Sequence, residues 1–178
     1  MSIRHLLHIY RWKKFGKNSK VIRPMRIFGE DNISIGNNVR IFNDARLEAI
    51  TNWRGKTLHG ELLIGDNTSI EQRVHIVAAD RLEIGHDVTI SANVYISDCA
   101  HAYGNNTNAI NASLDIKATK IGNYVFIGYG ACVMPGVTIG DNVIIGANAV
   151  VTHDCMEGCI YAGVPAKEIS KIRGTGNE

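Results

Sequence analysis

Aliphatic residues recur every six positions through the last third of the chain. The repeated residue is isoleucine or valine, at Ile121, Ile127, Val133, Ile139, Ile145 and Val151. A small or β-branched residue follows four positions after each, at Val125, Ala131, Val137, Val143, Ala149 and Cys155. A period of six fits neither an α-helix nor a single strand, in which alternate residues share a face. It predicts a solenoid in which each hexad supplies one short strand with its aliphatic residue pointing inward.

Glycine often follows the inward-pointing residue, as in Ile121-Gly122 and Ile145-Gly146. A glycine at this position helps the chain to turn a corner. Three hexads then close one triangular coil, and stacked coils bury a continuous column of aliphatic side chains. The pattern therefore predicts an all-β solenoid of triangular coils.

The same phase continues upstream, with a two-residue slip between Leu82 and Ile84 and another between Ile33 and Ile35. Six coils are predicted, over residues 15–34, 35–52, 64–83, 84–101, 121–138 and 139–156. Two insertions, 53–63 and 102–120, each follow the second coil of a pair, so we expect both to leave the prism at the same corner. Because functional loops of repeat proteins gather on one face, the longer insertion is where we expect chemistry.

The two ends of the chain depart from the six-residue pattern that defines a β-helix domain over residues 15–156. Residues 1–14 are predicted to form a cap, with a short helix over 3–15 that covers the unpaired edge of the first coil. The tail, residues 157–178, is predicted to contain a short helix that starts at Pro165 and continues over 168–173. Residues 174–178 are expected to be disordered.

Composition and charge narrow the functional classes. The 178 residues correspond to one domain, and a formal net charge of +2 argues against a dedicated nucleic-acid surface. Positive residues nevertheless cluster near the start, where we expect that they allow contact with an anionic membrane surface: Arg4, Arg11, Lys13, Lys14, Lys17, Lys20, Arg23 and Arg26. No apolar run approaches the roughly 18 residues that span a bilayer, and no secretory segment is recognised. The sequence predicts a cytoplasmic protein that is at most peripheral to the inner face of the membrane.

Neither cysteines nor histidines have the spacing of a metal site. The four cysteines at 99, 132, 155 and 159 match no tetrahedral zinc pattern, and no pair of His or acidic residues has ligand spacing. Cys132 and Cys155 are predicted as small core residues. No metal is therefore expected.

Two segments give the chain a likeness to a known family. They are residues 93–101, NVYISDCAH, and residues 139–152, IGDNVIIGANAVVT, which continue to the Gly-Val-Pro-Ala-Lys run at 163–167. On these segments, and over roughly residues 20–172, the chain resembles the hexapeptide-repeat acyltransferases, in particular the branch that O-acetylates sugars and antibiotics. The resemblance implies a left-handed parallel β-helix, a handedness that the periodicity does not give because parallel crossovers are usually right-handed. It also implies acetyl-CoA or a related acyl-CoA as cosubstrate and a homotrimer in which the His of one subunit faces a CoA held partly by its neighbour.

His101 is the predicted general base. An alcohol is a poor nucleophile at neutral pH, and a neutral imidazole can accept its proton as it attacks a thioester. His101 stands at the last position of the coil over 84–101, where the chain leaves the prism and where the resembling enzymes carry their catalytic His. The alternative is a corner histidine that only hydrogen-bonds a loop.

Four further residues are candidates for acceptor binding. Asp98, three residues before His101, is predicted to orient the imidazole or bind a substrate hydroxyl, with a plain corner residue as the alternative. Glu71 occupies a position where relatives place an Asn that contacts the acceptor, and a carboxylate there favours a polyhydroxy or cationic group. His75 is expected to line the same pocket, with a surface role as its alternative. Tyr103 lies in the Asn-rich loop over 102–120, a composition suited to sugar hydroxyls.

The resemblance also implies a CoA groove, matched residue by residue at Phe126, Tyr129, Ala147, Thr152, Lys167 and Lys171. Phe126 replaces the usual Trp and keeps a ring for the pantetheine arm. Lys167 is expected to meet the phosphates, with a solvated tail lysine as the alternative. The backbone amide of Tyr129 or Gly130 is expected to stabilise the carbonyl oxygen during transfer.

The sequence thus predicts an acetyl-CoA-dependent O-acetyltransferase that acts by direct transfer on a sugar or a surface-polysaccharide precursor. Covalent catalysis through Cys99 is disfavoured because no third group orients a Cys-His pair. Two alternatives stay open: an acetyltransferase for an amino sugar or an antibiotic hydroxyl, and a β-helix scaffold without catalysis.

Overall fold

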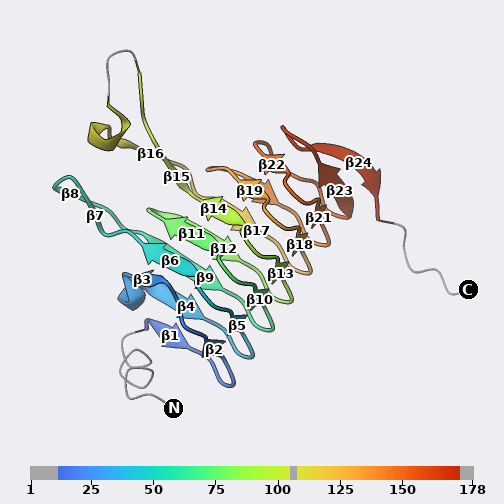
Figure 1. Cartoon of the computed structure of the whole chain (residues 1–178), viewed down its shortest axis with the longest axis horizontal. Coiled ribbons are helices and arrows are strands. Elements are labelled where there is room, and N and C mark those ends of the chain that lie inside the picture. The colour runs from blue at the N-terminus through green and yellow to red at the C-terminus, as the bar shows by residue number, and fades with distance from the viewer. Residues whose placement is uncertain (1–11, 105–107, 173–178) are drawn as a thin grey trace, which may run out of the picture.

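Three sheets form the sides of a triangular prism in the computed structural model, which describes residues 12–104 and 108–172 (Figure 1). The first sheet contains β1 (Lys14–Phe15), β4 (Ile33–Ile35), β9 (Glu61–Ile64), β12 (Arg81–Ile84), β17 (Thr119–Ile121) and β20 (Thr138–Ile139). The second contains β2 (Lys20–Val21), β5 (Arg40–Ile41), β10 (Ser69–Ile70), β13 (Thr89–Ile90), β18 (Phe126–Ile127), β21 (Ile144–Ile145), β23 (Cys159–Ala162) and β24 (Lys167–Lys171). The third contains β3 (Arg26–Phe28), β6 (Arg46–Ala49), β11 (His75–Ala78), β14 (Tyr95–Ser97), β19 (Cys132–Val133) and β22 (Val150–Val151).

Each predicted coil contributes one strand to each sheet, and neighbouring coils pair in parallel. We call the edge between the first and second sheets the first corner, the edge between the second and third sheets the second corner, and the edge between the third and first sheets the third corner. Apart from strands, the described chain has two short 3₁₀ turns, η1 (Glu30–Asn32) and η2 (Ala109–Asn111). The all-β solenoid predicted from the six-residue period is confirmed.

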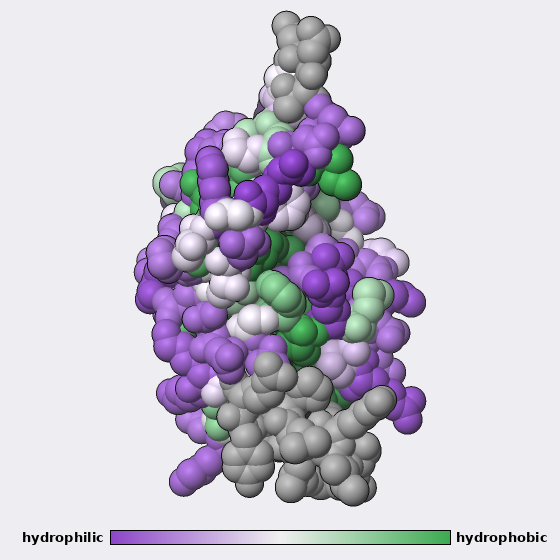
Figure 2. Space-filling view, turned by 90° about the vertical axis from the view of Figure 1, so that its left-hand side faces the viewer, coloured by the Kyte–Doolittle hydropathy of each residue, from purple (hydrophilic) through white to green (hydrophobic). Residues whose placement is uncertain are grey.

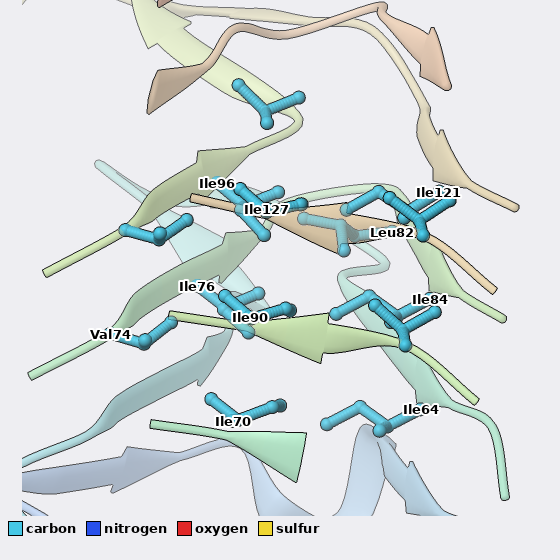
Figure 3. Close-up of a cluster of buried hydrophobic side chains, with 14 of the residues drawn as sticks. Ile64, Ile70, Val74, Ile76, Leu82, Ile84, Ile90, Ile96, Ile121 and Ile127 are labelled. Carbon is cyan, nitrogen blue, oxygen red and sulfur yellow. The ribbon is translucent and has the colours of Figure 1, made fainter. Parts of the chain in front are cut away.

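The core is a column of aliphatic side chains stacked in register. Ile70 lies beside Ile90, and Ile90 beside Ile127, on consecutive strands of the second sheet, and each is fully buried (Figure 3). Burying one such side chain contributes roughly 1.5–3 kcal/mol relative to leaving it exposed. Repetition of the same residue in every coil therefore stabilises the whole prism.

The two-residue slips are extra inward positions on the first sheet. Leu82 and Ile84 both lie on β12 and are both buried, because alternate residues of a strand share a face. They pair with Leu62 and Ile64 on β9. Each slip therefore adds two residues to one strand, and the residues of neighbouring coils remain in register.

Glycines at the first corner are required by the closeness of stacked backbones. A Cβ atom on Gly85 would lie 2.5 Å from the carbonyl oxygen of Gly122 in the next coil. Any side chain there would have to displace backbone atoms of the next coil. The repeated Ile-Gly pair therefore occurs at this corner because only glycine fits between the stacked backbones.

Both insertions leave the prism at the third corner, as predicted. The first forms a hairpin of β7 (Asn52–Trp53) and β8 (Lys56–Thr57), and the second a hairpin of β15 (Cys99–His101) and β16 (Leu114–Ile116) (Figure 1). The indole Nε1 of Trp53 donates a hydrogen bond of 3.0 Å to the Ala112 carbonyl, which joins the first insertion to the second. A small apolar cluster of Val77, Ala79 and Cys99 lies beneath them.

The predicted C-terminal helix is wrong. Residues 167–171 form β24, which runs antiparallel to β23 after a turn that contains a cis Val164–Pro165 bond. A helix would leave the edge of β23 unpaired, and pairing that edge satisfies its backbone groups. The other sheets are also covered at this end, because Cys155 bridges Ile139 and the amide of Val150 donates to the Gly163 carbonyl.

The predicted N-terminal helix lies mostly outside the described residues. At its end the structure differs, because Lys14–Phe15 form strand β1, which pairs with Ser34 and Ile35 of β4. Strand β4 gains a hydrogen-bonded neighbour in this way. Lys14 and Phe15 therefore adopt a strand conformation in place of the predicted helix.

Asp98 fastens the third corner. Its side chain is fully buried, and its two carboxylate oxygens accept hydrogen bonds from the backbone amides of Ala79 and Asp80, at 2.7 and 2.9 Å. The residue joins two consecutive coils at the point where the β15–β16 hairpin begins. These contacts give Asp98 a structural role, and its predicted contact with the imidazole or with a substrate hydroxyl stays a prediction.

Asp98→Asn is expected to lower the free energy of unfolding by about 1–3 kcal/mol, because one buried amide then faces an NH₂ group that cannot accept its hydrogen bond. Chemical denaturation measures the change. Asp80→Asn is the control: this exposed neighbour is expected to change stability by less than about 0.5 kcal/mol. A stable Asp98→Asn protein that has lost turnover would contradict the structural role.

Candidate active site

His101 lies on the longer hairpin with its imidazole exposed. It stands on β15 opposite Leu114 of β16, and its ring centroid is 5.3 Å from the ring centroid of Trp53. Within residues 12–104 and 108–172 the imidazole makes no hydrogen bond. Both ring nitrogens are therefore open to a ligand, and a general base requires one such nitrogen that can accept a proton.

Trp53 is the neighbour that the sequence analysis missed. Its ring packs against His101 while its Nε1 holds Ala112, and the adjacent Arg54 donates to the side-chain oxygen of Asn111 at 2.8 Å. The first hairpin thus holds the second at both the histidine and the η2 turn. The sequence did contain a signal for this contact, because the two insertions were predicted to leave the prism at the same corner and therefore to lie close together.

Asp98 and Cys99, which lie just before His101, are both buried. Burial raises the pKa of the Asp98 carboxyl, opposed by hydrogen bonds from the amides of Ala79 and Asp80, and each carboxylate oxygen accepts one of these two hydrogen bonds. Burial also raises the pKa of the Cys99 thiol, so the reactive thiolate is disfavoured. This agrees with the prediction that Cys99 is not a nucleophile.

The first and second corners differ in how their backbone amides are satisfied. At the first corner a side chain of the next coil accepts from the turn, as Asp66 does from the Asn37 amide at 2.7 Å and Asp141 from the Asn123 amide at 2.7 Å. At the second corner, equivalent amides donate to no other described residue; they belong to Gln72, Ala92, Tyr129 and Ala147. The second corner therefore offers a row of donors to an elongated ligand.

This row distinguishes the two candidates for stabilising a carbonyl oxygen. The amide of Gly130 donates to the Ala92 carbonyl at 3.0 Å and is already used by the fold. The amide of Tyr129 makes no hydrogen bond within the described chain. Tyr129 is thus the better candidate, and the sequence alone did not distinguish them.

Most of the other predicted groove residues gather on the second sheet and the second corner. Phe126 is half-exposed on β18, beside Ile144 of β21, which in turn pairs with β23. Lys167 and Lys171 are exposed at the two ends of β24, on the same sheet. Ala147 is exposed at the second corner. Thr152 lies apart, after β22 toward the third corner, where its hydroxyl contacts Nδ1 of His153 at 2.8 Å.

The candidate acceptor residues are divided between these regions. Glu71 begins the second corner, and His75 lies on the third sheet, edge-on to Tyr95 with ring centroids 5.3 Å apart. Burial, together with the charge of Arg46, lowers the pKa of His75 in spite of nearby Glu48, so its imidazole is uncharged near neutral pH. Tyr103 is strongly exposed on the hairpin loop after His101.

The structure thus places the predicted site residues in two regions of one chain. The β15–β16 hairpin, with His101 and Tyr103, extends from the third corner, whereas Tyr129 and Ala147 lie at the second corner. The third sheet separates these two corners. Among the residues that the structure describes, no cluster of three metal-ligating side chains occurs, and no helix is long and apolar enough to cross a membrane.

Residues 118–153 match the family described as "Bacterial transferase hexapeptide (six repeats)". The chain is 30% identical to Escherichia coli K12 WbbJ, whose name describes an O-acetyl transferase of lipopolysaccharide biosynthesis, across 95% of this chain and 87% of that protein. It is 34% identical to an Escherichia coli dTDP-4-amino-4,6-dideoxy-D-glucose acyltransferase, across 90% of this chain and 82% of the relative.

Among solved structures, the fold is similar to that of AntD, an N-acyltransferase from Bacillus cereus crystallised with dTDP-4-amino-4,6-dideoxyglucose and coenzyme A. The TM-score is 0.66 at 20% identity, over 97% of this chain and 90% of AntD. The predicted left-handed parallel β-helix is confirmed. By its repeats and by its identity to relatives over most of their length, the chain belongs to the hexapeptide-repeat transferases and is an acyltransferase of that family.

Proposed function

We propose that this protein is an acetyl-CoA-dependent O-acetyltransferase that uses His101 as its general base and acts on a sugar or a surface-polysaccharide precursor. The observation that carries the proposal is the exposed imidazole of His101, held against Trp53 with both ring nitrogens free of hydrogen bonds to described residues. WbbJ, a relative over nearly the whole chain, carries the name of an O-acetyl transferase of lipopolysaccharide biosynthesis, which supports a saccharide acceptor.

In the proposed reaction His101 takes the proton of the acceptor hydroxyl as its oxygen attacks the thioester carbonyl. The developing negative charge on the carbonyl oxygen is stabilised by the free amide of Tyr129. The C–S bond then breaks, and the imidazolium returns the proton to the departing CoA thiolate. Acetyl passes directly between the two substrates, in keeping with the buried thiol of Cys99.

The acyl donor fits the second corner and the second sheet. A pantetheine arm is long and carries amide groups that pair with backbone donors, which the free amides of Tyr129 and Ala147 supply. Phe126 provides an apolar surface, and Lys167 provides a positive charge for the phosphates. Coenzyme A in the AntD crystal supports this class of cosubstrate on the same fold.

The two half-sites meet between neighbouring copies of the chain. His101 extends from the third corner and the donors line the second corner, so a neighbour can present its second corner to the hairpin. A closed ring of three copies repeats this contact at every interface. The acceptor then lies in reach of Glu71, His75 and Tyr103.

Transfer to an amine is the second candidate. A relative at 34% identity is named an acyltransferase for an amino sugar carried on dTDP, and an amine needs the same removal of a proton during attack. The acidic side chain of Glu71 is compatible with either a polyhydroxy or a cationic amino acceptor. A panel of hydroxyl and amino sugars, free and nucleotide-linked, distinguishes the two by acetyl-CoA consumption.

His101→Ala is expected to lower kcat by at least about a hundredfold on the best acceptor of that panel, because the base is removed. The affinity for CoA, measured by calorimetry, is expected to change little. His59→Ala is the matched control, since His59 is also exposed near the third corner and has no role in the proposal. Full turnover by His101→Ala would contradict the mechanism. Failure of the wild-type protein to bind CoA would instead indicate a scaffold without catalysis.

Trp53 is proposed to position His101. Trp53→Ala is expected to lower kcat between about tenfold and a hundredfold, with the KM for acetyl-CoA unchanged, because the imidazole loses the surface that orients it. Trp53→Phe keeps a ring beside the imidazole and is expected to recover most of kcat. Steady-state kinetics of both variants, with thermal melting to check folding, make the comparison. Equal losses in the two variants would refute an orienting role for the ring.

The shared site predicts complementation. His101→Ala removes the base, and Ala147→Trp is expected to block the donor groove at the exposed second corner, so each variant alone is inactive. When the two are co-expressed, some interfaces combine an intact hairpin with an intact groove, and part of the wild-type turnover is expected to return. Mixing the separately purified, non-exchanging oligomers is the control. No recovery in verified mixed oligomers would show that each chain holds a complete site.

A further inference from the structure

The first coil carries a ring of exposed positive charges. Lysine or arginine occurs every third residue around it, and each lies on a different side or corner of the prism, from the first sheet round to the third. The members are Lys14, Lys17, Lys20, Arg23 and Arg26, and all of them are exposed. A spacing of three is half the repeat, so the ring follows directly from the period of the solenoid.

The ring belongs to a strong separation of charge along the chain. Residues 1–28 contain eight of the 19 Lys and Arg residues and none of the 17 Asp and Glu residues. This segment therefore has a formal charge of +8, and the remaining 150 residues have a formal charge of −6. The first coil, residues 15–34, has a formal charge of +2, because Lys17, Lys20, Arg23 and Arg26 are opposed by Glu30 and Asp31. Both acids lie in η1 at the third corner, so the part of the coil before η1 carries only positive charge.

Part of this charge has no partner in the described chain. Lys20 and Arg40 stand in register on neighbouring strands of the second sheet, and neither forms an ion pair with another described residue. Like charges in this arrangement disfavour folding. The third sheet resolves the same problem, because buried Glu48 bridges Arg26 and Arg46 at 2.8 and 2.9 Å. The positive second-sheet face is therefore available to an external anion.

Apolar side chains accompany the cations. Met25 and Phe28 are 67% and 41% exposed on the same coil, and the guanidinium of Arg26 lies 5.3 Å from the centre of the Phe28 ring. Figure 2 looks at this end of the prism and shows hydrophilic residues along both sides, with a smaller hydrophobic group between them. Cations around apolar groups are the composition of surfaces that dock at a lipid headgroup layer.

We propose that the first coil docks end-on against an anionic phospholipid bilayer. Cations distributed around all sides of one coil can face a plane together, whereas a nucleic acid strand or groove follows a stripe along one face. In this orientation the prism axis stands away from the membrane. The proposal goes beyond the acyltransfer reaction and does not depend on it.

The test is co-sedimentation of the full chain with vesicles of phosphatidylcholine alone or mixed with phosphatidylglycerol. Binding is expected only to the mixed vesicles and is expected to fall as salt is raised, because screening weakens the attraction. Lys14→Gln, Lys17→Gln and Lys20→Gln combined are expected to lower the partition coefficient by about a hundredfold. The matched control neutralises three exposed lysines elsewhere, with Lys56→Gln, Lys117→Gln and Lys120→Gln, and is expected to bind within about threefold of wild type.

Three results would overturn the proposal. The first is the absence of wild-type binding to mixed vesicles at low salt. The second is an equal loss in the two triple variants, which would indicate a general effect of charge. The third is tighter binding to single-stranded RNA than to the mixed vesicles at the same salt, which would assign the ring to a nucleic acid. None of these measurements uses acetyl transfer, so failure of docking is distinguishable from failure of the proposed enzyme.

Discussion

In-register stacking of equivalent residues is the constraint on which the rest of this structure depends. Each coil repeats the path of the one before, so Ile70, Ile90 and Ile127 meet inside while the residues that follow them meet at one corner. A residue type that recurs at one position of the repeat therefore forms a continuous row along one corner of the prism. The glycines of the first corner, the second-corner amides that have no acceptor within the described residues, and the hairpins of the third corner are three results of the same register.

The corners divide structural and functional roles. At the first corner, Asn and Asp side chains such as Asp66 and Asp141 satisfy the turn amides of a neighbouring coil, and accepting those hydrogen bonds lowers the pKa of both carboxyls. Side chains of neighbouring coils therefore satisfy several of the turn amides at this corner. At the second corner the residues Ala92, Tyr129 and Ala147 provide no such acceptor, so the backbone remains available for a ligand. The difference lies in side-chain chemistry, since the backbone path is alike.

Much of this architecture was predictable from the sequence because it depends on local repetition. The six coils, the common corner of the two insertions and the position of His101 where the chain leaves the prism follow from counting in sixes. The C-terminal strand was not predictable in this way, because residues 167–171 contain no strong strand pattern and their conformation is decided by pairing with β23. The roles of Asp98 and Trp53 likewise depend on partners many residues away, Ala79 and Ala112, that a period of six does not identify. The choice of Tyr129 over Gly130 required knowing which amide the neighbouring coil already uses.

The reversed strand β24 has a consequence for how copies of the chain associate. A stack of parallel coils ends in three rows of backbone groups that another copy's first coil would extend, and repeated extension produces a fibre. Here β24 and the tail occupy those rows, with Cys155 on the first sheet, β23 on the second and Gly163 on the third. Another copy's first coil therefore cannot extend β20, β21 and β22 directly at that terminus, and lateral contact through the flat flanks of the prism remains open. The proposed ring of three copies uses this lateral contact, which brings the β15–β16 hairpin of one copy to the second corner of its neighbour.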